Sequence, residues 1–168
     1  MRNERRWGWL WLMLAVVAAD RATKTIFEVY TAADFHRELI RNFVYLVHNR
    51  NPGIGFGLLA DSASSWVRVA IIVGQLLVMA ALAWLLVAGP AGGRWARGGL
   101  ALILGGAAGN LVDRLLHGGV TDFFEVLIGS YHWPAFNLAD TAITVGATLV
   151  ILELLFSARQ ATGEPRKG

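Results

Sequence analysis

Residues 105–126 read GGAAGNLVDRLLHGGVTDFFEV, and the interpretation of the whole chain depends on this stretch. It follows the apolar run ARGGLALIL (96–104), yet it introduces charged and amide side chains at Asn110, Asp113, Arg114, Asp122 and Glu125. An ionisable side chain at membrane depth costs several kcal/mol unless it is paired or hydrated, so such residues mark functional sites by default. The first question is therefore whether the surrounding segments cross a membrane.

The composition is typical of an integral membrane protein. Hydrophobic residues make up 55% of the 168 residues, the mean hydropathy is +0.49, and seven residues are Trp. A helix that crosses a bilayer needs about 20 apolar residues, and four segments reach that length, namely 7–27, 66–88, 96–116 and 136–157. We therefore predict an α-helical integral membrane protein with four transmembrane helices in a single membrane domain, 1–168. The first segment begins like a signal peptide but lacks a small-residue cleavage pattern, so we interpret it as a retained helix.

Basic residues indicate how these spans are oriented. They gather at both ends of the chain and in the 89–97 loop, namely at Arg2, Arg5, Arg6, Arg94, Arg97, Arg159, Arg166 and Lys167. Because basic loops remain in the cytoplasm, we predict cytoplasmic termini and outer loops at 28–65 and 117–135. Anionic lipid headgroups suffice as partners for the basic tails, and no basic tract interleaved with aromatic residues indicates a nucleic acid. The chain has no Cys, which excludes disulfides and a thiol nucleophile.

The first outer loop contains a candidate sheet element. FVYLVH (43–48) is rich in aromatic and β-branched residues, NRNPG (49–53) is a turn signal, and IGFGLL (54–59) follows it. This pattern predicts a small, hairpin-like extracytoplasmic β element. Two strands alone are marginally stable in water, so we expect this element to lean on the membrane domain or the bilayer surface.

Polar residues recur along one face of three predicted helices. Residues three and four positions apart share a helix face, and this spacing places together Asp20, Thr23 and Lys24; Gly106, Gly109, Asn110, Asp113 and Arg114; and Asn137, Asp140, Thr141 and Thr144. In the predicted orientation, all three polar stripes lie toward the outer ends of their helices. We expect them to converge at one depth, beneath the outer loops.

Several of these residues also have a purely structural interpretation. Asp20 and Lys24 fit two roles, either an ion pair that closes the outer end of the first helix or a contact to substrate. Asp113 beside Arg114 fits a structural or orienting pair better than an acid catalyst, because a carboxylate held by a guanidinium stays ionised. The GGAAG run (105–109) fits a surface on which a neighbouring helix packs closely.

Two further groups have unspecific patterns. Asn51 and Gly53 are compatible with simple turn chemistry. The four histidines are scattered over predicted loops without the spacing of metal ligands, and we therefore predict no metal site at His36, His48, His117 or His132.

Asp122 and Asp140 are the candidates for chemistry. Asp122 lies among Val120, Phe123 and Phe124, and Asp140 lies about one turn inside the 136–157 helix. Two carboxyl groups that meet in a partly desolvated place share one proton and titrate as a unit. The ionised member can then take a proton from an attacking water, while the protonated member polarises the scissile carbonyl and helps to protonate the leaving amine. Spacing alone does not establish that the two side chains meet.

The chain resembles the lipoprotein signal peptidase (signal peptidase II) family, bacterial inner-membrane aspartyl proteases that remove signal peptides from prolipoproteins. Five stretches carry the resemblance, in order along nearly the whole chain: DRATK (20–24), NPGIGFG (51–57), GGAAGNLVDR (105–114), VTDF (120–123) and PAFNLADTAI (134–143). Five ordered motifs on four predicted spans are a specific signature. The 28–42 loop and the two tails add nothing to it.

The resemblance implies a set of functional assignments. Asp122 and Asp140 correspond to the catalytic dyad, and the positions implied to support the dyad, shape the site or hold substrate are Asp20, Lys24, Asn51, Gly53, Asn110, Asp113, Arg114 and Asn137. It favours a site role for Asn51 over turn chemistry alone. The implied substrate is a prolipoprotein cut just before a diacylglyceryl-modified Cys, and no metal or organic cofactor is implied. We further expect a monomer in the bacterial inner membrane, with its active site near the extracytoplasmic face.

Two other classes of function fit membrane-embedded polar residues. A proton-coupled transporter would use Asp and Lys as a relay, and it would show an inverted repeat or broken helices along a through-path. We find no such symmetry in the sequence. A non-catalytic scaffold would account for GGAAG but would leave Asp122 and Asp140 without a role.

Overall fold

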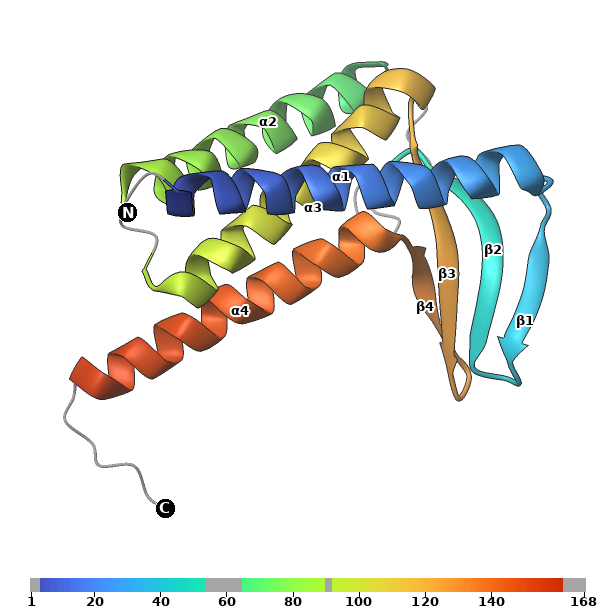
Figure 1. The fold of residues 1–168 in the computed structure, drawn as a ribbon. Helices are drawn as coiled ribbons and strands as arrows, with labels where there is room; N and C mark the ends of the chain where they lie inside the picture. The colour runs from blue at the N-terminus through green and yellow to red at the C-terminus, as the bar shows by residue number, and fades with distance from the viewer. Residues whose placement is uncertain (1–3, 54–64, 90–91, 162–168) are drawn as a thin grey trace.

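The computed structural model describes residues 4–53, 65–89 and 92–161. The elements follow one another as α1 (Glu4–Tyr30), β1 (His36–Ile40), β2 (Val44–Asn51), α2 (Ser65–Ala88), α3 (Arg94–His117), β3 (Val120–Ile128), β4 (Tyr131–Phe136) and α4 (Leu138–Ala161). Figure 1 shows the sheet lying across one end of the helical bundle. The structure therefore confirms a mostly helical chain with a small antiparallel sheet.

Three helices are long and apolar enough to cross a membrane, and they coincide with three of the predicted spans. They are Ser65–Ala88, Arg94–His117 and Leu138–Ala158. The remaining predicted span, 7–27, does form a helix, α1, but its apolar run is interrupted by Asp20, Arg21 and Lys24. Among the described residues, α1 therefore does not meet the length and hydropathy criteria for a membrane span.

The glycine-rich start of the 105–126 stretch places α3 at the centre of the bundle. Helix α3 contacts α1, α2 and α4. A Cβ atom added at Gly105 would lie 2.9 Å from Val16 Cβ on α1, and one added at Gly106 would meet the Ala139 carbonyl and Ile143 on α4. Only glycine allows both neighbours to come this close. The predicted packing role of GGAAG is thus confirmed.

The sheet is a four-stranded antiparallel meander in the order β1-β2-β3-β4. The predicted strand over 43–48 is present as the start of β2, but its partners are β1 and β3. Segment 54–59, which we expected to form the second strand of a hairpin, lies outside the described residues. Strands β3 and β4 occupy the 117–135 loop and its end, for which we predicted no strand, so both outer loops build one sheet.

A left-handed glycine connects the central helix to the sheet. Gly118, with a φ of 72°, caps the end of α3, and its N–H donates to the Arg114 carbonyl at 3.1 Å. Glycine adopts this conformation without the steric cost that other residues bear. The chain therefore leaves α3 at His117 and enters β3 at Val120, so Asp122 follows closely on the end of the central helix.

Candidate active site

A cavity of about 670 Å³ lies between α2, α3, α4 and the sheet. Asp122 from β3 and Asp140 from α4 both line it, as do Asn51, Asn110 and Arg114. The rest of its wall is largely apolar and includes Ala70, Ile71, Val78, Met79, Leu82, Ile103, Val120 and Phe136. Pockets of this kind, mostly apolar with a few convergent polar groups, are the usual form of a substrate site.

Asp122 is almost completely buried at the inner end of β3, with 2% exposure. Its Oδ1 accepts a hydrogen bond from the Asn137 amide at 2.6 Å, and its Oδ2 accepts one from the Asn51 amide at 3.3 Å. Burial, reinforced by the negative charge of Asp140, raises the pKa of Asp122 to about 7, against the lowering effect of the two amides. A carboxyl group in this setting changes its protonation near neutral pH.

Asp140 belongs to a reciprocal capping arrangement at the start of α4. The Asn137 side chain accepts from the Asp140 N–H at 2.9 Å, and Asp140 Oδ2 accepts from the Asn137 N–H at 3.3 Å. This is a capping box with Asp in the position usually held by Glu. Asp140 Oδ1 accepts from the Asn110 amide at 2.8 Å. Asn137 therefore hydrogen-bonds to both members of the predicted dyad and fixes their relative placement.

Asn110 links this dyad to a buried cation. Its Oδ1 accepts from Lys24 Nζ at 2.9 Å and from the Asn137 amide at 3.3 Å, while its own amide donates to Asp140. The side-chain oxygen of Asn110 thus accepts from two donors, so the side-chain nitrogen is the end that points at Asp140. The oxygen–nitrogen orientation of this amide follows from the network itself.

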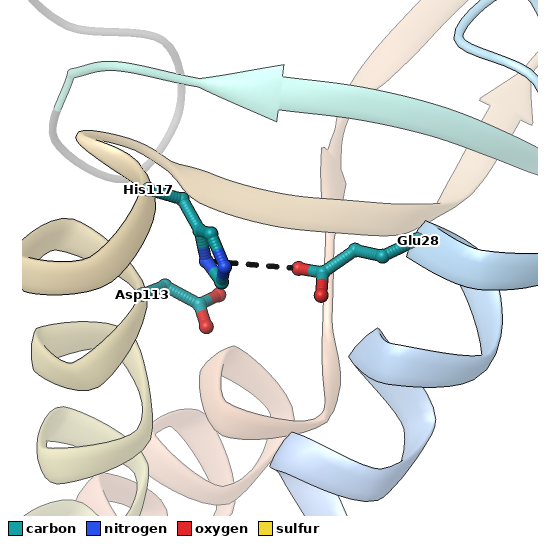
Figure 2. A group of neighbouring side chains, drawn as sticks. All are labelled: Glu28, Asp113 and His117. Carbon is teal, nitrogen blue, oxygen red and sulfur yellow. Dashed lines mark ion pairs between the residues drawn. The ribbon is translucent and has the colours of Figure 1, made fainter.

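Glu28, Asp113 and His117 gather where α1 and α3 end (Figure 2). Each offers a ligand atom within 4.8 Å of the others, a proximity that the spacing of His117 in the sequence does not reveal. The carboxylates are already engaged, because Arg21 forms ion pairs with both Glu28 and Asp113, and Lys24 lies 3.0 Å from Asp113 Oδ2. A metal ion would have to displace these cations. The trio is thus better described as part of an ion-pair cluster than as a metal centre.

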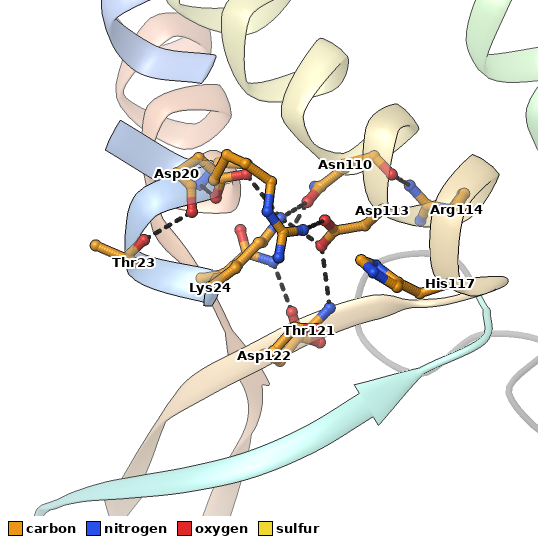
Figure 3. A network of polar contacts seen from close by, with 12 residues as sticks. Asp20, Thr23, Lys24, Asn110, Asp113, Arg114, His117, Thr121 and Asp122 are labelled. Carbon is orange, nitrogen blue, oxygen red and sulfur yellow. Dashed lines mark hydrogen bonds and ion pairs between the residues drawn. The ribbon is translucent and has the colours of Figure 1, made fainter. Parts of the chain in front are cut away.

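Asp20, Lys24 and Asp113 form a buried ion-pair cluster (Figure 3), and each is 0% exposed. Lys24 Nζ lies 2.8 Å from Asp20 Oδ2 and 3.0 Å from Asp113 Oδ2. Asp20 also accepts the Ala139 N–H at 2.9 Å, which fastens the start of α4 to α1. None of the three lines the cavity. Of the two interpretations of Asp20 and Lys24, the structure therefore favours the structural ion pair.

Arg114 does not form the ion pair that its place beside Asp113 suggested. We expected it to pair with Asp113, but adjacent helical residues point in different directions, and Asp113 instead binds Lys24 and Arg21. Arg114 donates to the Gly53 carbonyl at 3.0 Å, to Gln75 Oε1 at 3.2 Å and to the Asn110 carbonyl at 3.3 Å. The expected Asp113–Arg114 pair is wrong, and Arg114 instead ties the loop after β2 to α2 and α3.

Asn51 and Gly53 combine turn chemistry with a place in the site. The Asn51 side chain accepts from the Gly53 N–H at 2.9 Å, a local turn, while its amide reaches Asp122. The carbonyl of Gly53 is held by Arg114. The turn thus orients the amide that contacts the carboxyl group.

Four residues of the network were not predicted. Gln75, the single amide in the apolar α2, donates to the Ala107 carbonyl at 2.6 Å and could have been found by its isolation in an apolar run. Arg21 lies within DRATK, but the helix-face argument passed over it. Thr121 lies within VTDF, but no role was assigned to it, and Glu28 has no signal in the sequence, because its contact with Thr121 joins segments 93 residues apart.

The fold and this cleft define a membrane protein with two neighbouring carboxyl groups at one end of a helical bundle. The family model for signal peptidase (SPase) II matches residues 12–156. The chain belongs to the signal peptidase II family, and it is therefore a membrane peptidase.

Named relatives and solved structures agree with this membership. The lipoprotein signal peptidase of Solibacter usitatus is 38% identical over 159 residues, or 93% of this chain and 95% of the relative. That of Vibrio vulnificus is 40% identical over 146 residues, or 86% of each chain. Two solved structures, both of bacterial membrane enzymes determined by the in meso method, match with TM-scores of 0.80 and 0.78 at 25% and 28% identity. These matches cover 96% and 88% of this chain and 94% and 92% of the solved chains.

Proposed function

We propose that this protein is an aspartic endopeptidase that removes the signal peptide from diacylglyceryl-modified prolipoproteins, cutting just before the lipidated Cys. One observation supports the aspartic mechanism above all: Asp122 and Asp140 line the same cavity, and Asn137 hydrogen-bonds to both carboxyl groups. The names of the relatives support the lipoprotein substrate. No metal or organic cofactor enters the proposed reaction.

In the proposed reaction the dyad shares one proton. We assign this proton to Asp122, whose pKa burial raises to about 7, and the role of general base to Asp140, whose oxygens accept from two N–H donors at the start of α4. Asp140 takes a proton from water as the water attacks the scissile carbonyl, and Asp122 polarises that carbonyl. The proton gained from water then passes to the leaving amine as the carbon–nitrogen bond breaks. The dyad returns to its singly protonated state.

The proposal includes a membrane placement for the whole chain. We infer that α1 is the fourth span, in addition to the three apolar helices, because its interrupting charges are paired inside the protein: Asp20 with Lys24, and Arg21 with Asp113 and Glu28. Paired charges that face the interior are tolerated in membranes. The basic residues at the ends of the chain favour cytoplasmic termini in the bacterial inner membrane. The sheet and the dyad then lie near the extracytoplasmic face, where water is available.

The cavity suits a lipidated peptide. Its wall along α2 presents Ile71, Val78 and Leu82 beside the polar groups of the dyad. An apolar signal helix can pack on such a wall while the scissile bond lies at Asp122 and Asp140, and the acyl chains remain in lipid. We propose that a single chain carries the complete site, since every residue of the dyad and its amide contacts comes from this chain.

The decisive experiment measures cleavage of a lipidated and an unlipidated prolipoprotein by purified enzyme. Asp122→Asn and Asp140→Asn, made separately, should each abolish cleavage, because an amide can neither accept nor share the proton. Asp34→Asn, at an exposed position before β1, is the matched control and should cleave normally. Near-native cleavage by either dyad variant would defeat the mechanism, and equal rates with both substrates would remove the lipid requirement.

A further inference from the structure

Thr121, directly before Asp122, makes two hydrogen bonds outside the sheet pairing of β3. It is 0% exposed. Its backbone N–H donates to Asp113 Oδ2 at 3.2 Å (Figure 3). Its hydroxyl donates to Glu28 Oε1 at 2.7 Å. Helices α3 and α1 therefore each hold the same residue of β3.

Arg21 joins the two acceptors of Thr121. Its guanidinium forms ion pairs with Asp113 and with Glu28, one through each terminal nitrogen. Forked donors of this kind fix two carboxylates at a set separation. The backbone and the side chain of Thr121 thus meet two acceptors whose positions are set by one cation.

The same face of β3 carries a second contact to α1. Successive side chains of a strand alternate between its two faces, so Thr121 and Phe123 share one face and Asp122 points to the other. The ring of Phe123 stacks on Phe27, with centroids 4.5 Å apart and an interplanar angle of 9°. One face of the strand is therefore fastened to the end of α1, and the opposite face presents Asp122 to the cavity.

We propose that Arg21, Glu28 and Thr121 are positioning residues of the peptidase and together form a clamp, the Thr121 clamp, that fixes the strand segment carrying Asp122. This inference rests on the proposed catalytic role of Asp122. None of the three residues lines the cavity, so none contacts substrate there. They act through the placement of the Asp122 carboxyl group between the amides of Asn137 and Asn51.

The clamp matters for rate because proton transfer is sensitive to small displacements. A misplacement of about 1 Å can lower a catalysed rate roughly a hundredfold. Asp122 meets Asn137 at 2.6 Å but Asn51 only at 3.3 Å, so a modest shift of β3 would break the longer contact. Release of the clamp should therefore lower kcat, and it should leave KM nearly unchanged because the cavity wall is intact.

The test begins with Thr121→Val, which removes the hydroxyl at nearly constant volume, and Thr121→Ser, which keeps it. For Thr121→Val we expect kcat to fall by about tenfold to a hundredfold with KM within about twofold of the parent, and for Thr121→Ser we expect nearly full activity. Thr148→Val is the matched control, because among the described residues the Thr148 hydroxyl bonds only the Thr144 carbonyl of its own helix. Parental kcat in Thr121→Val, or an equal loss in Thr121→Ser, would overturn the proposal.

A double-mutant cycle with Glu28→Leu provides an independent measurement. If the hydroxyl acts through Glu28, the double variant should lose no more kcat than the worse single variant. Multiplying losses would overturn the clamp. Glu125→Leu, farther along β3 and in contact with His132, controls for loss of a carboxylate from this region. The two hypotheses fail in different ways. If only the clamp is wrong, Asp122→Asn is inactive while Thr121→Val cleaves normally. If the proposed function is wrong, Asp122→Asn itself cleaves.

Discussion

Replacing Asp122 with Asn should abolish cleavage and, at the same time, stabilise the folded protein at neutral and alkaline pH. Burial together with Asp140 raises the pKa of Asp122 from 3.8 to about 7. The folded protein thus binds this proton more tightly than the unfolded chain does. The stability that the proton contributes is complete below about pH 4 and is lost as the pH rises through about 7. Asn carries no charge at any of these pH values, so the variant avoids this loss.

The size of the effect follows from the pKa. Each pKa unit corresponds to about 1.4 kcal/mol. The raised pKa of Asp122 therefore lowers the stability of the folded protein, relative to a side chain that does not titrate, by about 4 kcal/mol at pH 8 and by less than 2 kcal/mol at pH 5. The new amide would point a donor at the Asn51 amide, now 3.3 Å away, and a lost hydrogen bond costs about 1 kcal/mol. The variant should therefore gain about 3 kcal/mol at pH 8 and under 1 kcal/mol at pH 5.

Thermal unfolding in detergent micelles, followed by Trp fluorescence, measures this gain. For a chain of this size, about 1 kcal/mol shifts Tm by roughly 2–4 °C, so Asp122→Asn should melt about 6–12 °C above the parent at pH 8 and close to it at pH 5. Asp34→Asn, which removes an exposed carboxylate, should show no pH-dependent difference. A Tm difference between Asp122→Asn and the parent that is the same at both pH values would refute the reasoning, because the gain would then not come from a titrating group.

The glycine packing, the buried lysine and the dyad provide three more tests. Gly109→Ala would place a Cβ atom 2.5 Å from Asp20 Oδ2 and should lower stability by about 1–3 kcal/mol. A Cβ atom at Gly74 would have nothing within 4 Å, so Gly74→Ala should leave Tm unchanged. Equal Tm values for the two variants would contradict the packing argument. Lys24→Met should lower stability by about 3–5 kcal/mol, seen as a lower Tm and a lower folded yield, because it leaves buried carboxylates without their cation. A Tm equal to that of the parent would show that stability does not depend on this ion-pair cluster. The kcat for cleavage should decline as the pH rises through about 7, when Asp122 loses its proton, and a rate that stays constant across this range would speak against a shared proton.

The sequence predicted the helices correctly because they depend on local patterns. Apolar runs of sufficient length locate α2, α3 and α4 to within a few residues. The three polar stripes converge as expected, because i, i+3 and i+4 spacing places residues such as Asp20 and Lys24 on one helix face. The roles of the dyad came from the chemistry of paired carboxyl groups and from the family resemblance, and they stay a proposal until tested.

The parts that sequence reasoning missed depend on contacts between distant segments. The aromatic and β-branched residues on both sides of Gly129 and Ser130 are a local strand pattern that our prediction did not use. Their addition to the sheet begun by β2, however, is a contact between distant segments. Neighbours in sequence were also a poor guide to ion pairs: Asp113 binds Lys24 and Arg21 on α1, whereas Arg114 reaches Gly53. Tertiary placement decides these partners, and periodicity within one helix carries no information about it.

The site separates its carboxylates into two kinds according to their partners. Asp20, Asp113 and Glu28 are bound by the cations Lys24 and Arg21. In the described part of the chain the dyad forms no ion pair, and its oxygens accept from the amides of Asn51, Asn110 and Asn137 and from one backbone N–H.

This division has a chemical consequence. A cation in contact with a carboxylate holds it ionised, whereas neutral amides orient it and leave its proton free to move. The cationic cluster can therefore hold α1, α3 and β3 together without placing a cation in contact with the dyad. Any substitution that brings a cation into contact with Asp122 should consequently impair cleavage even where the fold and the cavity are unchanged.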